Sequence, residues 1–155
     1  MIHILEREQV VHHSLEDVFS FFSDAANLSR ITPPRLNFKI LTPLPIEMKT
    51  GAEIDYQIRL FGVPFAWKTL IETFEPKRRF VDRQLKGPYK LWRHTHEFQE
   101  TPTGTVMHDR VEYEVPLGPL GAIARALFVR RQVEEIFEYR ASIVDSLFTT
   151  NAKAS

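Results

Sequence analysis

The alternation of apolar and polar residues predicts a chain composed mostly of strands up to residue 115. Residues 53–60 place Ile54, Tyr56, Ile58 and Leu60 on one face and polar side chains on the other, which is the two-residue period of a half-buried strand. Other segments with strand character are 2–12, 36–41, 65–74, 79–85, 89–98 and 105–115. Their connections are short enough for hairpins, so the pattern favours one antiparallel sheet of about seven strands.

Helical patterns occur in two regions. From Pro119 to Phe148, apolar residues recur at a spacing of about 3.6, and charged residues lie on the opposite side. Such a helix would be about 45 Å long. After the first strand, Ser14 and Asp17 resemble an N-cap pair that begins a short helix. Residues 24–30 predict a second brief helical segment, which the prolines at 33 and 34 end.

These elements together predict an α+β fold. A curved antiparallel sheet of about seven strands wraps around the long C-terminal helix, with two short helices after the first strand. A single helix about 10 Å wide cannot fill the concave side of such a sheet, so we expect a cavity between them. The length fits one domain. We predict that residues 1–149 form it and that 150–155 are a flexible tail.

Composition argues against several classes of function. Lys plus Arg and Asp plus Glu number 20 each, so no net field attracts a nucleic acid, and none is expected as a partner. Without cysteine, disulfides, thiolate chemistry and zinc–thiolate sites are unavailable. No apolar run approaches the ~20 residues that cross a bilayer. The N-terminus becomes charged too early for a signal peptide, so we predict a cytoplasmic protein without a membrane span.

The hairpin of residues 87–115 carries the most distinctive side chains. Its first strand puts Trp92, His94, His96 and Phe98 on one face. If residues 101–104 form the loop, Phe98 lies opposite Met107 and His96 lies opposite Asp109. Tyr113 shares that face. Two imidazoles and a carboxylate on an apolar face cost free energy unless they are paired, so this is the candidate site.

Two interpretations of this cluster remain open. In the first, His96 and Asp109 form a general-base dyad, and Tyr113 donates a hydrogen bond to a developing oxyanion. In the second, which we favour, the members of the cluster hydrogen-bond to one another, or they form the wall of a pocket that binds a ligand without catalysis. The spacing of His94 and His96 also suits a metal, with Asp109 as an oxygen ligand, but a third nitrogen ligand is missing. We therefore predict no metal, and no cofactor either.

Other side chains are candidates for contact with a ligand. They lie on the sheet and on the long helix: Tyr56, Trp67, Trp92, Leu127, Phe137 and Arg140. Ordinary core packing is the alternative for the aromatic and aliphatic members. Arg140 differs, because an inward-pointing guanidinium needs an anionic partner such as Asp82, Asp109 or a ligand carboxylate.

Several motifs together resemble those of the SRPBCC superfamily. They are Phe21-Phe22-Ser23-Asp24, Thr32-Pro33-Pro34, Gly87-Pro88-Tyr89 with Trp92, His94, His96 and Phe98, Asp109 with Tyr113, and the Pro-Leu-Gly-Pro-Leu-Gly run at 116–121. Within the superfamily, the chain looks like a ligand-binding, polyketide-cyclase-like branch. The resemblance implies a START-like helix-grip fold with a deep pocket for a hydrophobic small molecule.

The expected function is to bind a hydrophobic, cyclic or aromatic molecule between the sheet and the C-terminal helix. Such a ligand needs a pocket of at least ~300 Å³. One alternative is a cofactor-independent cyclase, dehydratase or isomerase that acts on a polyketide-like carbonyl compound through His96 and Asp109. A second is a co-chaperone-like interaction module. A homodimer is a further possible assembly.

Overall fold

The sheet and the long helix have the predicted arrangement. The computed structural model describes the backbone of residues 1–60, 62–116 and 122–154, and the side chains of these except 122–126 and 150–154. Within them, one seven-stranded antiparallel sheet has the order β1-β7-β6-β5-β4-β3-β2. The strands are β1 (His3–Val11), β2 (Lys39–Ile40), β3 (Glu53–Leu60), β4 (Val63–Glu75), β5 (Arg79–Lys86), β6 (Leu91–Thr101) and β7 (Gly104–Glu114). The predicted α+β helix-grip architecture is confirmed.

Short helices connect β1 to β2. Helix α1 (Leu15–Phe22) begins as predicted, because Ser14 Oγ accepts a hydrogen bond from the Asp17 N–H at 3.1 Å. The 3₁₀ helices η1 (Ala25–Ile31) and η2 (Pro34–Leu36) follow. The predicted strand 36–41 is only Lys39–Ile40, because η2 takes up its first residue and Asn37 is left-handed with a φ of 45°.

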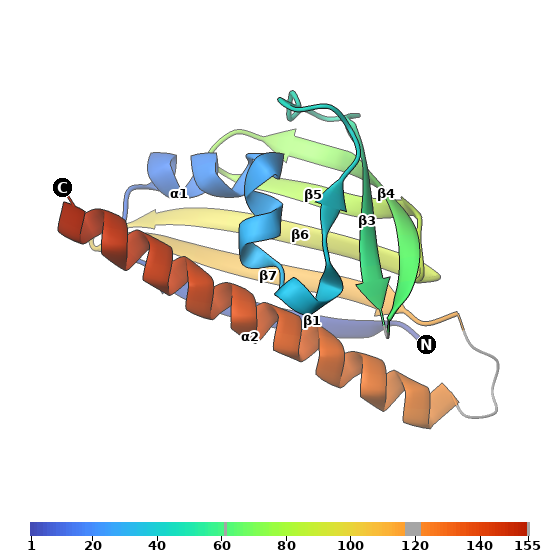
Figure 1. The fold of residues 1–155 in the computed structure, drawn as a ribbon. Coiled ribbons are helices and arrows are strands. Elements are labelled where there is room, and N and C mark those ends of the chain that lie inside the picture. The colour runs from blue at the N-terminus through green and yellow to red at the C-terminus, as the bar shows by residue number, and fades with distance from the viewer. Residues whose placement is uncertain (61, 117–121, 155) are drawn as a thin grey trace.

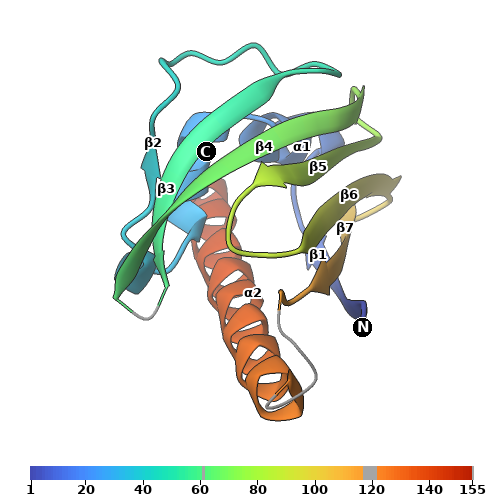
Figure 2. The same cartoon turned by 90° about the vertical axis from the view of Figure 1, so that its right-hand side faces the viewer.

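The C-terminal helix lies in the opening of the curved sheet. Helix α2 (Ala122–Ala154) runs along the strands in Figure 1, and Figure 2 shows the sheet curving around it, with β3 on one side and β1 on the other. The predicted start at 119–121 lies outside the described residues. The helix extends past Phe148 and covers 150–154, most of the predicted tail. No helix of the described residues combines the length and the hydropathy needed to cross a membrane.

A single apolar stripe attaches α2 to the rest of the protein. Val144 and Phe148 pack with α1 and with Phe98 of β6, whereas Val133 and Phe137 pack with β1 and β7. Spacings of four, seven and four residues keep these side chains on one helical face. Beside this stripe, Ile136 packs with Ile58 and Trp67 above β3 and β4. Side chains from the sheet, the short helices and α2 together enclose the remaining space.

The β6–β7 hairpin has the predicted register. Phe98 pairs with Met107, and His96 pairs with Asp109. The loop is shorter than predicted, since Thr101 and Gly104 already form the last pair, but this does not shift the register. Gly104 has a φ of +152°, and a Cβ there would overlap the backbone of Val11. Only glycine fits this turn, which therefore helps to hold His96 opposite Asp109.

Candidate functional site

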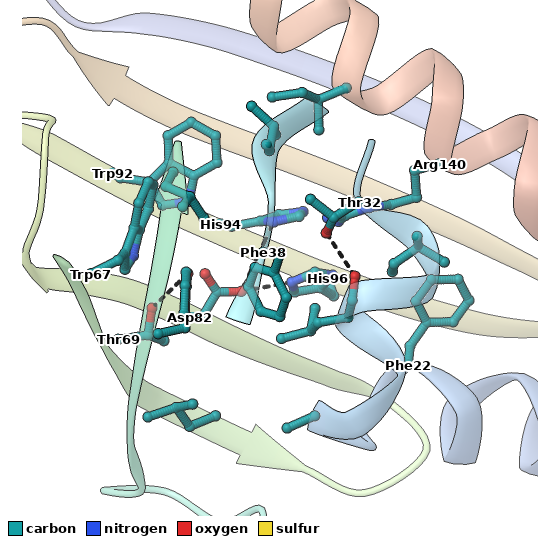
Figure 3. A pocket seen from close by; sticks show the side chains of 18 of the residues that line it. Phe22, Thr32, Phe38, Trp67, Thr69, Asp82, Trp92, His94, His96 and Arg140 are labelled. Carbon is teal, nitrogen blue, oxygen red and sulfur yellow. Dashed lines mark hydrogen bonds and ion pairs between the residues drawn. The ribbon is translucent and has the colours of Figure 1, made fainter. Parts of the chain in front are cut away.

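A cavity lies between the sheet, the short helices and α2 (Figure 3). Its volume is about 140 Å³. Most of its wall is aromatic and aliphatic, with contributions from Phe22, Ile58, Trp67, Ile71, Trp92 and Phe137. Asp82, His94, His96 and Arg140 add charged or ionisable groups to this wall. The site is therefore an apolar cavity with ionisable side chains in one part of its wall.

The cavity is smaller than the sequence led us to expect. At about 140 Å³ it falls below the ~300 Å³ of a typical ligand pocket and matches the ~150 Å³ of an apolar cavity that holds benzene. Aromatic rings from the sheet occupy the remaining space: Trp67 stacks on Tyr56 with centroids 5.6 Å apart and meets Trp92 edge-on at 5.5 Å. In this conformation, the cavity accommodates one ring.

Three neighbouring strands bring four ionisable groups together. In the β5–β6 register, Asp82 lies opposite His94, and in the β6–β7 register Asp109 lies opposite His96. The shortest contacts are diagonal. Nε2 of His94 donates to Asp109 Oδ1 at 2.8 Å, and Nε2 of His96 donates to Asp82 Oδ2 at 2.8 Å. The structure thus brings together the predicted pair and a second carboxylate, that of Asp82.

Each imidazole faces both carboxylates. Nδ1 of His96 lies 3.1 Å from Asp109 Oδ1, without the alignment of a hydrogen bond, and Nδ1 of His94 lies 3.9 Å from Asp82 Oδ2. The ring centroids of His94 and His96 are 3.6 Å apart. The predicted dyad of His96 and Asp109 is therefore one side of a four-membered cluster, in which Asp109 makes its hydrogen bond to His94.

The surroundings of the cluster exclude bulk water. His94 and His96 are only 4% and 6% exposed. Phe80 stacks on His96 with centroids 4.2 Å apart, and Phe137 of α2 meets His94 edge-on at 5.3 Å. Charges in such a place are tolerated only when partners compensate for their lost hydration, so the four groups depend on one another.

The two histidines have pKa values shifted in opposite directions. Burial lowers the pKa of both, but the contacts of His96 with Asp109 and Asp82 outweigh it and raise the pKa of His96. For His94, burial and the neighbouring charge of His96 prevail over the bond to Asp109, so its pKa is lowered. As the pH falls, His96 therefore takes up its second proton before His94 does.

Both carboxyl groups stay ionised. Burial acts to raise the pKa of Asp82 and of Asp109, but hydrogen bonds from the imidazoles and the imidazole charges reverse this and hold each pKa below its ordinary value. When His96 is protonated, its positive charge and that of Arg140 balance the two carboxylates. This balance makes the burial of the cluster physically reasonable.

The predicted ligand-contacting residues fall into two groups. Tyr56, Trp67, Trp92, His94, His96, Phe137 and Arg140 line the cavity. Asp109 is not part of that lining and holds His94 from behind. Tyr113 is 1% exposed and packs with Leu5 and Val133 instead. Leu127 is 61% exposed, because its end of α2 projects away from the sheet (Figure 2).

Asp82 is the member of the cluster that the sequence did not place beside the histidines. The strand pattern contained a signal, since Asp82 shares the inward face of β5 with Phe80, which is 4% exposed. The position of Asp82 opposite His94 follows only from the register of β5 against β6. The connection between these strands, which contains Gly87 and Pro88, does not reveal that register.

Asp82, His94 and His96 also offer a possible set of metal ligands. Their donor atoms lie within 4.8 Å of one another, and two imidazoles with one carboxylate suit several transition metals. Nε2 of His94 and Nε2 of His96 each already bond to a carboxylate at 2.8 Å, however. A metal ion held by this set would have to displace the proton between His96 and Asp82. The hydrogen-bonded cluster describes the site better.

Comparison with known proteins identifies a family and a fold. Residues 11–139 match the family described as polyketide cyclase/dehydrase and lipid transport. No curated protein matches the sequence. Among solved structures, the aromatase/cyclase ZhuI from Streptomyces sp. R1128 superposes with a TM-score of 0.78 at 15% identity, over 98% of this chain and 96% of that chain.

Two other structures extend the comparison. The di-domain ARO/CYC StfQ from the steffimycin biosynthetic pathway gives a TM-score of 0.76 at 13% identity, over 99% of this chain and 53% of StfQ, so this chain spans about half of that protein. Ara h 8.0201 gives 0.67 at 11% identity, over 97% and 99% of the two chains. Identities this low establish the shared fold only.

The opposite pKa shifts can be measured by NMR titration of the imidazole nitrogens. We expect His96 to titrate above 6.5 and His94 below 6.5. Asp109→Asn removes a carboxylate that favours the imidazolium, so it should lower the pKa of His96, whereas Asp145→Asn on the exposed side of α2 should not. Two histidines that titrate together, or a His96 unaffected by Asp109→Asn, would contradict this electrostatic description.

Proposed function

Because this chain belongs to the polyketide cyclase/dehydrase and lipid transport family, we propose that it binds a ring-sized, mainly apolar small molecule in the cavity beside α2. One observation supports the proposal above all. An apolar cavity of about 140 Å³ has a buried, charge-balanced cluster in its wall. A core that served stability alone would gain more from apolar residues at these positions.

The size of the cavity limits the ligand and its affinity. An aromatic ring that buries about 150–250 Å² gains about 4–6 kcal/mol at ~25 cal/mol per Å². Association itself costs at least ~4 kcal/mol, so apolar contact alone supports only weak binding. Tight binding therefore requires hydrogen bonds from the ionisable part of the wall.

A substitution that fills the cavity tests this proposal. Ala25 is buried in the cavity wall, and its neighbour Ala26 is exposed. We expect Ala25→Leu to reduce the affinity for benzene-sized ligands at least about tenfold by occupying their space, and Ala26→Leu to have little effect. Ligand titration followed by NMR measures both. Equal affinity in the two variants would place the ligand elsewhere.

Acid–base catalysis on a carbonyl compound is the second candidate function. The specific observation is the pair of histidines whose environments separate their pKa values, a recurrent arrangement of acid–base sites. His94 is neutral, its Nε2–H is held by Asp109 at 2.8 Å, and Nδ1 makes no hydrogen bond within the described residues. His94 is therefore better suited as the base than His96, whose pKa is raised by both carboxylates.

The step that this geometry supports is removal of a proton from carbon next to a carbonyl group. His94 Nδ1 takes the proton, and the electron pair of the broken C–H bond moves toward the carbonyl oxygen to give an enolate. The charges of His96 and Arg140 stabilise that oxygen. Cyclisation, dehydration and isomerisation of carbonyl compounds can all begin with this step. The protein-interaction alternative stays a prediction from the sequence.

Exchange of carbon-bound hydrogen for deuterium tests the second function without a known substrate. We expect the wild-type protein in D₂O to accelerate deuterium incorporation next to the carbonyl of cyclohexanone, as measured by NMR. His94→Gln should remove at least about 99% of this acceleration, whereas His108→Gln, on the opposite face of β7, should preserve it. Exchange that equals the buffer rate, or that survives His94→Gln, would exclude His94 as the base.

A further inference from the structure

We propose that the ligand carries an acceptor oxygen on an sp² carbon, a carbonyl or a carboxylate, and that Arg140 donates hydrogen bonds to it. The inference rests on the proposed binding function and assigns the chemical class of its ligand. The ring would lie against the aromatic wall, and its oxygen would face α2. Arg140 lines the cavity, and its guanidinium has no hydrogen-bond acceptor within the described residues.

Arg140 has charge compensation nearby and a cation–π contact, with its Cζ 5.1 Å from the centroid of the Phe137 ring, but no hydrogen-bond acceptor in the part of the chain that the structure describes. Within the described residues, it makes no ion pair within 4.0 Å and no hydrogen bond, and its Nε is buried without an acceptor. Burial lowers the pKa of its guanidinium, and the charges of Asp109 and Asp82 act against this from a longer distance. By contrast, Arg130 and Arg131 on the same helix reach Glu134 and Glu135 at 3.1 and 3.2 Å.

One oxygen of each nearby carboxylate already contacts the histidines, and neither carboxylate lies within 4.0 Å of the guanidinium of Arg140. Asp109 Oδ1 accepts from His94 and lies 3.1 Å from Nδ1 of His96, while Asp82 Oδ2 accepts from Nε2 of His96. Guanidinium donors need acceptors in a fixed planar arrangement. A buried donor that lacks one loses its hydration without compensation. A ligand oxygen would compensate for this loss, and so would contribute directly to affinity.

The rest of the wall also has donors in excess. Trp67 Nε1 is buried without an acceptor. The hydroxyl groups of Tyr56 and Thr69 bond to each other at 3.2 Å, and that of Thr32 donates to the Leu28 carbonyl at 2.6 Å. Among the described residues of the wall, the fully buried side-chain atoms without a hydrogen bond are all nitrogens, on Trp67, His96 and Arg140. This asymmetry favours a ligand that accepts hydrogen bonds.

The placement of these groups defines the shape of the ligand. In Figure 3, Trp67 and Trp92 lie on one side of the cavity, Arg140 reaches in from α2 on the other, and His94 lies between them. A ring against the tryptophans would direct a substituent past His94 toward Arg140. A single ring with a carbonyl or carboxylate on the adjacent carbon has this shape.

Three nearly isosteric probes test the inference: cumene, acetophenone and benzoate. Each has a phenyl ring and one carbon with two substituents, but only the last two have acceptor oxygens. We expect acetophenone, benzoate or both to bind the wild-type protein at least about tenfold more tightly than cumene, as a charge-assisted hydrogen bond implies. Acetophenone preference identifies a neutral carbonyl ligand and benzoate preference an acid. Isothermal titration calorimetry measures the affinities.

Variants connect the preference to Arg140. Arg140→Met keeps an apolar stem and removes the donors, so it should reduce the preference over cumene to less than about threefold, whereas Arg131→Met should preserve it. An NMR measurement does not depend on the folding of a variant: the Nε–H resonance of wild-type Arg140 should shift with the preferred probe and not with cumene.

The failures are distinguishable. If cumene binds as tightly as both oxygen-bearing probes, or if Arg140→Met keeps the preference, the acceptor oxygen is wrong and the cavity binding function stands. If the Nε–H resonance of Arg140 does not shift when the preferred probe is added, Arg140 is not the residue that binds the acceptor oxygen. If none of the three probes binds, both this inference and the proposed function are overturned.

Discussion

The pairing of two buried imidazoles with two buried carboxylates is the constraint on which the rest of the site depends. Removing Asp82 takes the hydrogen-bond acceptor from His96, and removing Asp109 takes it from His94, while removing either imidazole leaves a buried carboxylate without its hydrogen-bond donor. The contacts are short, with both hydrogen bonds at 2.8 Å, and they cross three adjacent strands. The registers of β5, β6 and β7 must therefore all be correct at once. A slip of one residue in any of them would turn the groups to the other face.

The cavity follows from the same architecture. Helix α2 covers only part of the concave face of the sheet, and the short helices and the aromatic rings of the sheet itself cover the rest. Together they leave about 140 Å³ unfilled. The fold therefore places the cavity directly beside the charged cluster. Their proximity is what connects fold to function: an apolar ligand in this space would contact His94 and His96 and would lie within reach of Arg140.

The sequence was sufficient where short-range pattern decides the structure. Alternation identified the strands, and the position of the hairpin turn placed His96 opposite Asp109. It was insufficient where long-range packing decides. The partnership of Asp82 with the histidines needs the β5–β6 register, which an irregular connection hides. The exposure of Leu127 depends on where α2 leaves the sheet, which helical periodicity does not specify. The cavity volume depends on how Trp67 and Trp92 pack against each other, and no local pattern encodes this.

The central feature of the site is an apolar cavity beside a charge-balanced cluster, with the guanidinium of Arg140 not paired with either carboxylate. A high-resolution crystal structure of the wild-type protein under xenon pressure tests this most directly, because xenon occupies dry apolar cavities of this size. The account requires xenon density between Trp67 and His94, with the Arg140 guanidinium more than ~4 Å from Asp82 and Asp109, the limit for an ion pair. A structure without xenon there, in which Arg140 fills the space and pairs with either carboxylate, would contradict it.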